Sequence, residues 1–189
     1  DDIPRVSEFS EFLELSIENL LSRIPPGDIL VLNNTRVLKR RVFVDSLEIL
    51  FLNSSDQQRW EVLFPSKKYK IGDEINLPLG RKMKLLKKGR PQEVLIDLPL
   101  DESYFSQVAE LPLPPYIQQM RQRMGKDRHT LKADESWYQT AWAHQAGSFA
   151  APTASLHFSM EDIDKLKSRG VLVVELTLHV GLGTFLPVT

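Results

Sequence analysis

Six short segments with alternating apolar and polar residues lie between positions 40 and 98, and this pattern constrains the fold more than any other feature. The segments are separated by runs rich in Gly, Pro, Asn, Asp and Ser, which favour tight turns. Alternation with a period of two residues predicts strands that bury one face. The expected strands cover residues 41–44, 47–52, 60–64, 74–77, 83–86 and 93–98. Six short strands joined by tight turns are typical of a small barrel or curled sheet.

The sequence on either side of these strands predicts helices as well as strands. Apolar residues recur at steps of three and four between positions 9 and 24, which predicts a helix over residues 10–23. The continuous apolar run at 29–32 predicts a buried strand. A helix is expected over 101–110, an extended proline-rich segment over 111–117 and a polar loop over 118–135. Ser159 and Gly170 have the residue types that cap a further helix, which a strand over 171–180 follows.

These elements predict an α/β (α+β) fold in which a larger domain, residues 1–39 and 99–189, is interrupted by a small all-β barrel at 40–98. A chain of 189 residues with 42% hydrophobic residues is long enough for such a core. It contains no cysteine, which excludes disulfides and thiol catalysis and fits a cytoplasmic protein. No apolar run approaches the length of a membrane span, so no membrane partner is expected.

Positive charge is concentrated on the predicted barrel, although the formal net charge of the chain is only -1. Residues 59–90 contain ten Lys or Arg and three Asp or Glu. Such a surplus indicates a polyanionic partner, because neutralised phosphates supply most sequence-independent affinity for nucleic acids. The alternative is a solvated, lysine-rich face that binds nothing. The candidate nucleic-acid contacts are Lys39, Arg40, Arg41, Lys67 and Lys68.

Residues 147–158 form an uncharged segment of mostly small side chains that allows close approach of a ligand. It precedes the helix that begins after Ser159, where free backbone N–H groups favour an anion or a polar ligand. His157 lies in this segment, and His179 precedes a glycine-rich turn. Histidine exchanges protons near neutral pH, so the pair indicates a site, although each is also explained as a core histidine. The other candidates here are Ser148, Ala151, Pro152, Thr153, Gly181, Gly183 and Thr184.

Two further segments carry candidate binding residues. The run Asn33, Asn34, Thr35 and Arg36 follows the strand at 29–32; the amides are explained equally well by a turn, whereas Arg36 favours a phosphate or carboxylate. Tyr116 ends the proline-rich segment and is expected either in a pocket wall or in a linker. Three aromatic residues within 137–142 either stack on bases or fill the core.

Five segments, in this order, resemble the S-adenosylmethionine:tRNA ribosyltransferase-isomerase family of queuosine biosynthesis. They are residues 27–37 (GDILVLNNTRV), 111–117 (LPLPPYI), 138–140 (YQT), 147–158 (GSFAAPTASLHF) and 177–188 (TLHVGLGTFLPV). The resemblance implies that S-adenosylmethionine is a co-substrate whose ribosyl part is transferred to 7-aminomethyl-7-deazaguanine at the wobble position of tRNA. Rearrangement there gives epoxyqueuosine and releases adenine and methionine.

The resemblance also suggests roles for the candidate residues. His157 and His179 are the candidates for proton transfer. The candidates for substrate binding are the other residues named above: Asn33, Asn34, Thr35, Arg36, Tyr116, Ser148, Ala151, Pro152, Thr153, Gly181, Gly183 and Thr184. No metal is expected. The protein is expected to be a monomer. Family members continue beyond the glycine-rich turn, so the larger domain is expected to be incomplete at both ends. The alternative function is that of a truncated or non-catalytic relative that only binds tRNA.

Overall fold

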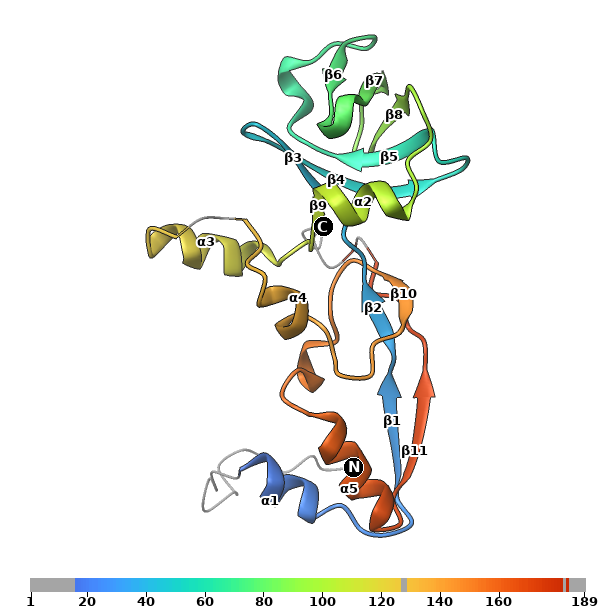
Figure 1. Ribbon diagram of the computed structural model, residues 1–189, viewed down its shortest axis with the longest axis vertical. Helices are drawn as coiled ribbons and strands as arrows, with labels where there is room; N and C mark the ends of the chain where they lie inside the picture. Colours follow the sequence, from blue (N-terminus) through green and yellow to red (C-terminus); the bar gives the residue numbers. More distant parts are fainter. Residues whose placement is uncertain (1–15, 127–128, 182, 184–189) are drawn as a thin grey trace, which may run out of the picture.

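The computed structural model describes residues 16–126, 129–181 and 183 (Figure 1). The molecule is elongated. A curled antiparallel sheet lies at one end, and paired parallel strands flanked by helices run toward the other end. The chain passes through the paired strands before the curled sheet and returns to them after it.

The curled sheet has seven strands in the order β6-β7-β8-β5-β4-β3-β9, and all of its pairs are antiparallel. Its strands are β3 (Arg41–Val44), β4 (Leu47–Ser54), β5 (Arg59–Leu63), β6 (Glu74–Asn76), β7 (Lys82–Lys87), β8 (Gln92–Ile96) and β9 (Ala109–Glu110), with 3-10 turns η2 (Ser66–Lys68) and η3 (Pro78–Gly80). The six strands predicted from alternation are confirmed to within two residues at each end. The order is open, with β6 and β9 at its two edges, so the sheet is a curled half-barrel rather than the closed barrel that was expected.

Alternation explains how this sheet builds its core. Along β7, Met83 and Leu85 are fully buried while the lysines between and beside them are exposed. Helix α2 (Glu102–Val108), capped by Asp101, covers the sheet with Phe105. Its ring packs edge-on against Phe51 and Trp60, at centroid distances of 5.3 and 5.2 Å. The lysines of β7 are thereby directed to solvent.

Residues before and after the curled sheet pair with each other. Strand β1 (Ile29–Asn33) is parallel to β11 (Leu172–Leu176), and β2 (Thr35–Val37) is parallel to β10 (Gln145–Ser148). Helix α5 (Met160–Ser168) packs on the first pair together with α1 (Ile17–Ser22), whose predicted residues 10–15 lie outside the described part of the chain. The caps predicted for α5 are confirmed: Ser159 and Asp162 form a capping box, and Gly170 follows with a φ of 87°.

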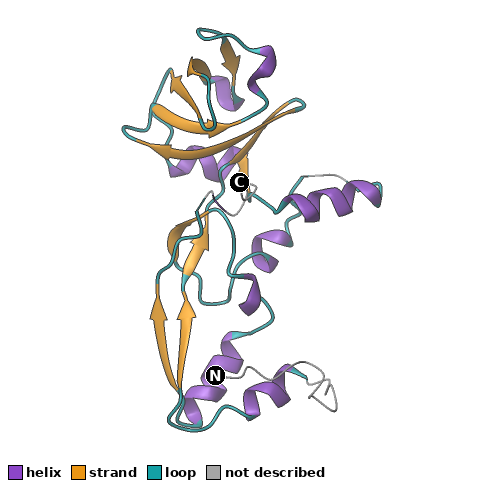
Figure 2. Ribbon diagram, turned by 180° about the vertical axis from the view of Figure 1, so that it is seen from behind, coloured by secondary structure: helices purple, strands orange, loops and turns teal. Residues whose placement is uncertain are grey.

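Strand β1 is not the fully buried strand that its apolar run predicted. Figure 2 shows the helices on one side of the paired strands, and Leu30 and Leu32 pack on that side. Parallel register places Ile29 beside Leu172 on the opposite face, where they are 63% and 58% exposed. The same apolar sequence therefore has one covered and one open face.

The region from residue 111 to 137 is more helical than predicted. Residues 111–114 are extended, but helix α3 (Pro115–Arg123) begins at Pro115, and α4 (Asp134–Trp137) follows. Proline at the first helical position costs no hydrogen bond, so Pro115 starts a helix instead of extending the segment. The segment 118–135, expected as a polar loop, therefore begins within α3 and ends within α4, and among the described residues 124–126 and 129–133 are loop (Figure 1).

Candidate active site

The polar residues that follow β1 hold the segment after β11. The Asn33 side chain donates from Nδ2 to the carbonyl oxygen of Leu178 at 2.9 Å. Its Oδ1 accepts from the backbone N–H groups of Leu178 at 3.1 Å and Thr35 at 3.2 Å. A single amide therefore fixes the chain immediately before His179. The alternative for Asn33, that its side chain only stabilises a local turn, does not account for these contacts with Leu178.

His179 contacts the Thr35 hydroxyl, which in turn contacts the Ser148 hydroxyl. The Oγ1 atom of Thr35 lies 2.8 Å from Nδ1 of His179 and 2.7 Å from Oγ of Ser148. The Ser148 oxygen also accepts from the backbone N–H of Val180 at 2.8 Å. Thr35 and Ser148 are fully buried, whereas His179 is exposed. These contacts hold the ring by Nδ1 and leave Nε2 as the ring nitrogen available for proton exchange.

The absence of a side chain at Gly147 makes room for the His179 ring. A Cβ atom built on Gly147 would lie 2.4 Å from Cε1 and 2.6 Å from both ring nitrogens. Such distances are far inside van der Waals contact, so any larger residue displaces the ring or the backbone. The small residue at this point of the sequence is therefore explained by packing against a histidine.

Replacing Gly147 by Ala is expected to destabilise the protein by about 1–3 kcal/mol through overpacking. The cost should fall but not vanish when His179 is also replaced by Ala, because the clash with the ring is removed whereas the φ of 156° at Gly147 still strains a side chain. Urea unfolding of the two single variants and the double variant measures this coupling. Additive free energies of unfolding in the double variant would contradict the packing described above.

A second polar group lies around Asn34, which is 7% exposed. Its Nδ2 donates to Oε2 of Glu175 at 3.1 Å and lies 3.5 Å from Nε2 of His144, while its Oδ1 accepts from Oγ1 of Thr177 at 2.7 Å. His144 Nδ1 lies 3.0 Å from the carbonyl oxygen of Trp142, so that nitrogen is the protonated one and Nε2 is an acceptor. His144 and Glu175 were not predicted as site residues. The pairing of β1 with β11 places Glu175 near Asn34, and the backbone N–H of His144 donates to the Asn34 carbonyl oxygen at 3.0 Å.

His157 does not belong to either group. It lines a hollow of about 360 Å³ with Tyr116, Trp137, Tyr138 and other residues of the helical flank. This "flank hollow" also includes Thr153 of η4 (Thr153–Ser155). The two histidines predicted as a pair thus lie in separate sets of contacts, one against Thr35 and one beside Tyr116.

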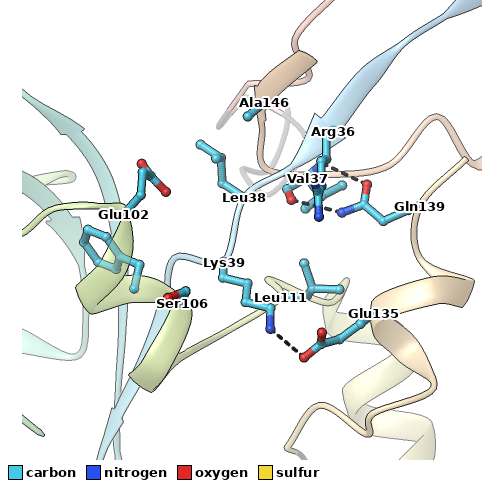
Figure 3. A pocket seen from close by; sticks show the side chains of 11 residues that line it. Arg36, Val37, Leu38, Lys39, Glu102, Ser106, Leu111, Glu135, Gln139 and Ala146 are labelled. Atoms are coloured by element: carbon cyan, nitrogen blue, oxygen red, sulfur yellow. Dashed lines mark hydrogen bonds and ion pairs between the residues drawn. The ribbon is translucent and has the colours of Figure 1, made fainter. Parts of the chain in front are cut away.

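Arg36 and Lys39 line another hollow, of about 330 Å³, between α2, α4 and the end of β2 (Figure 3). The Lys39 ammonium lies 2.6 Å from Oε1 of Glu135. Gln139 exchanges two hydrogen bonds with the backbone of Val37, at 2.9 and 3.0 Å, and so fixes this wall. Arg36 is exposed and remains a candidate for an anionic group.

Arg40 and Arg41 do not occupy the exposed positions expected of nucleic-acid contacts. Arg40 is 5% exposed, pairs with Glu102 and lies over the Phe105 ring at 4.2 Å. Arg41 is 1% exposed and contacts Glu48 at 2.7 Å and Gln118 at 2.9 Å. Their guanidinium groups are engaged inside the protein, so the prediction that they bind a polyanion is not supported. Lys67 and Lys68 are exposed on η2.

The remaining small residues proposed from the sequence differ in their exposure to solvent. Ala151 is buried and Pro152 half-buried, whereas Gly181 and Gly183 are exposed. Thr184 lies outside the described residues. At the N-terminus of α5 the capping box satisfies the backbone N–H groups of Ser159 and Asp162, at 2.9 and 3.2 Å, which reduces the set of free N–H groups expected to meet a ligand.

Over 16–126, 129–181 and 183 there is no group of three or more His, Cys, Asp or Glu side chains arranged to hold a metal ion. Over the same residues, every helix is too short or too polar to cross a membrane.

Comparison with known proteins identifies the class. The model of the family described as "Queuosine biosynthesis protein" matches residues 6–189, and the chain belongs to this family. Among solved structures it is similar to an S-adenosylmethionine tRNA ribosyltransferase from Thermotoga maritima, with 23% sequence identity and a TM-score of 0.34. The match covers 85% of this chain and 44% of that one, so the chain spans less than half the length of that relative.

Proposed function

We propose that this protein acts in queuosine biosynthesis as a tRNA-modifying enzyme that uses S-adenosylmethionine as a ribosyl donor. The acceptor is 7-aminomethyl-7-deazaguanine at the wobble position, and the products are epoxyqueuosine in tRNA, adenine and methionine. Membership in the family supports the pathway. The observation that carries the chemical proposal is the contact of His179 with the buried Thr35 hydroxyl, which is itself bonded to Ser148.

The chemistry requires a base beside the donor. The positive sulfonium of S-adenosylmethionine acidifies the adjacent ribose carbon, so a positioned base can remove a proton from it. His179 fits this role, because Thr35 holds Nδ1 and leaves Nε2 to accept the proton. The proton then has to reach a leaving group: adenine departs as a neutral base only if a proton or hydrogen bond reaches its ring. His157 remains our candidate for proton transfer or hydrogen bonding to the adenine ring.

The tRNA is proposed to contact the lysines on the curled sheet. Lys67, Lys68 and the exposed lysines of β7 provide the positive surface. Part of that charge is offset within the protein, since Arg59 lies 3.5 Å from Glu93 and Lys82 lies 3.9 Å from Glu74. The two η2 lysines are therefore the clearer phosphate contacts of this set, and their affinity should fall with added salt.

We expect the purified protein to release adenine from S-adenosylmethionine only when tRNA carrying the aminomethyl base is present. Chromatographic measurement of adenine, with unmodified tRNA of the same sequence as the control, tests this directly. The acceptor amine is needed to trap the ribosyl fragment, so the control should give no product.

Another outcome favours the alternative function. Salt-sensitive retention of tRNA with no adenine release from either tRNA would identify a protein that binds tRNA without turning over the donor. An equal release of adenine with both tRNAs would contradict the proposed acceptor. Retention no better than that of an acidic control protein would remove tRNA as a partner.

A further inference from the structure

The flank hollow combines a buried apolar floor with exposed aromatic rings at its rim. Leu113 and Tyr138 form part of the floor and are 2% and 5% exposed. Tyr116, from the first turn of α3, and Trp137, from the end of α4, are 66% and 70% exposed. Figure 1 shows these two helices following one another along the flank of the molecule. Large rings are seldom left in water, so two beside one hollow indicate a surface made for a ligand.

The charged residues of this hollow neutralise each other. Arg121 donates to both carboxylate oxygens of Asp134, at 2.8 and 2.6 Å, and Asp134 is 4% exposed. The carboxylate also accepts from the backbone N–H of Leu131 at 2.7 Å. With the guanidinium engaged in this two-point contact, the wall offers no free charge to a phosphate. A neutral ligand suits the hollow better than an anionic one.

Polar groups at the hollow suit the edge of a heterocyclic ring. Thr153 and His157 are exposed and can donate or accept hydrogen bonds. The Tyr138 hydroxyl contacts the backbone of Ala151, and burial raises the pKa of this phenol above its ordinary value. The volume of about 360 Å³ is within the usual range for small-molecule pockets, ~300–1,000 Å³.

We infer that the flank hollow binds a purine ring, stacked on Trp137 beside Tyr116 and contacted at its edge by His157. The choice of a purine or a 7-deazapurine of the same shape rests on the proposed function, which has one of each: the adenine of S-adenosylmethionine and the deazaguanine of tRNA. Stacking on an aromatic side chain is open to either ring. The two sources differ in what else they carry, and this difference allows a test.

The protein offers a direct optical signal for this contact. It has three tryptophans, of which Trp60 and Trp142 are 6% and 5% exposed and Trp137 is 70% exposed. A base stacked on Trp137 should quench its fluorescence and leave the two buried indoles almost unchanged. Titrations with S-adenosylhomocysteine and with an anticodon stem-loop carrying the aminomethyl base distinguish the donor from the acceptor as the source.

We expect one of these probes to quench the fluorescence in a saturable manner, and Trp137→Leu to abolish the signal. In calorimetric titration with the same probe, Trp137→Leu should weaken binding about tenfold, the size expected for one stacked base. The matched control is Met124→Ala, which removes a 65% exposed side chain on the same flank, outside the lining of the hollow. Its affinity should equal that of the wild type.

The outcomes separate this inference from the proposed function. Unchanged affinity in Trp137→Leu, or no quenching by either probe, would overturn the purine site even if adenine release is observed. Binding that depends on Trp137 in a protein that releases no adenine would retain the site and refute the reaction. Equal weakening by Met124→Ala and Trp137→Leu would show a general effect on the flank and would also overturn the assignment.

Discussion

Replacement of His179 by Ala should lower the rate of tRNA-dependent adenine release by at least ~100-fold, the lower end of the range for general acid-base catalysis. The expectation rests on the position of the ring, with Nδ1 held 2.8 Å from the Thr35 hydroxyl and Nε2 left to exchange a proton. Single-turnover adenine release at saturating S-adenosylmethionine measures the chemical step separately from binding.

Two further variants test whether His179 transfers the proton. His179→Gln keeps a polar group near Thr35 but cannot act as an acid or base near neutral pH, so its rate should be as low as that of the Ala variant. Thr35→Val removes the hydroxyl and leaves the histidine, so it should retain part of the activity and change its pH profile. His179 is exposed, and neither replacement of it should alter the unfolding midpoint greatly. A rate within about tenfold of the wild type, or ~1.4 kcal/mol of barrier, would exclude His179 from proton transfer.

Local signals in the sequence were sufficient for the curled sheet and for helix α5. Each strand of the sheet needs only alternation and a turn, both of which are properties of adjacent residues. The helix was bounded correctly because Ser159 and Gly170 act on the backbone next to them. Closure of the sheet could not be deduced in this way, because it depends on whether two distant edges meet, and the strand order leaves β6 and β9 apart.

Burial was harder to predict than secondary structure. The run at 29–32 gives no indication that Ile29 and Val31 face outward, because an apolar side chain is compatible with either face. The extended reading of residues 111–117 failed for a different reason. Proline disfavours the helical conformation in the residue before it but suits the first turn of a helix, and Pro115 occupies that position.

The candidate site was only partly predictable because its members come from three separate segments. Asn33, Thr35, Ser148 and His179 were each proposed from sequence, and parallel pairing brings them together. His157 was assigned to the same site on the basis of residue type, yet it lies in the flank hollow. The contact of His144 with Asn34 had no sequence signal, since it depends on the register of strands more than one hundred positions apart.

Arg41 shows why positive charge in the sequence overstated the nucleic-acid surface, and it gives the largest expected effect on stability. Its side chain is 1% exposed, with Glu48 at 2.7 Å and Glu110 at 3.7 Å, so it joins β3, β4 and β9 from within. Arg41→Met should destabilise the protein by about 3–5 kcal/mol, because it leaves Glu48 partly buried without its cation, while the Glu110 carboxylate keeps only its contacts with His129 and Thr130. Urea unfolding followed by circular dichroism measures the change.

The matched control is Arg59→Met on the same sheet. Arg59 is 56% exposed and lies 3.5 Å from Glu93, a geometry in which ion pairs contribute at most about 1 kcal/mol. A difference between the two variants of less than about 1 kcal/mol would contradict a structural role for Arg41.

Retention of tRNA by the folded Arg41→Met protein tests whether Arg41 also contacts nucleic acid. Because the Arg41 guanidinium is enclosed, its loss should leave tRNA affinity unchanged, whereas replacing exposed Lys67 and Lys68 should weaken binding and reduce its dependence on salt.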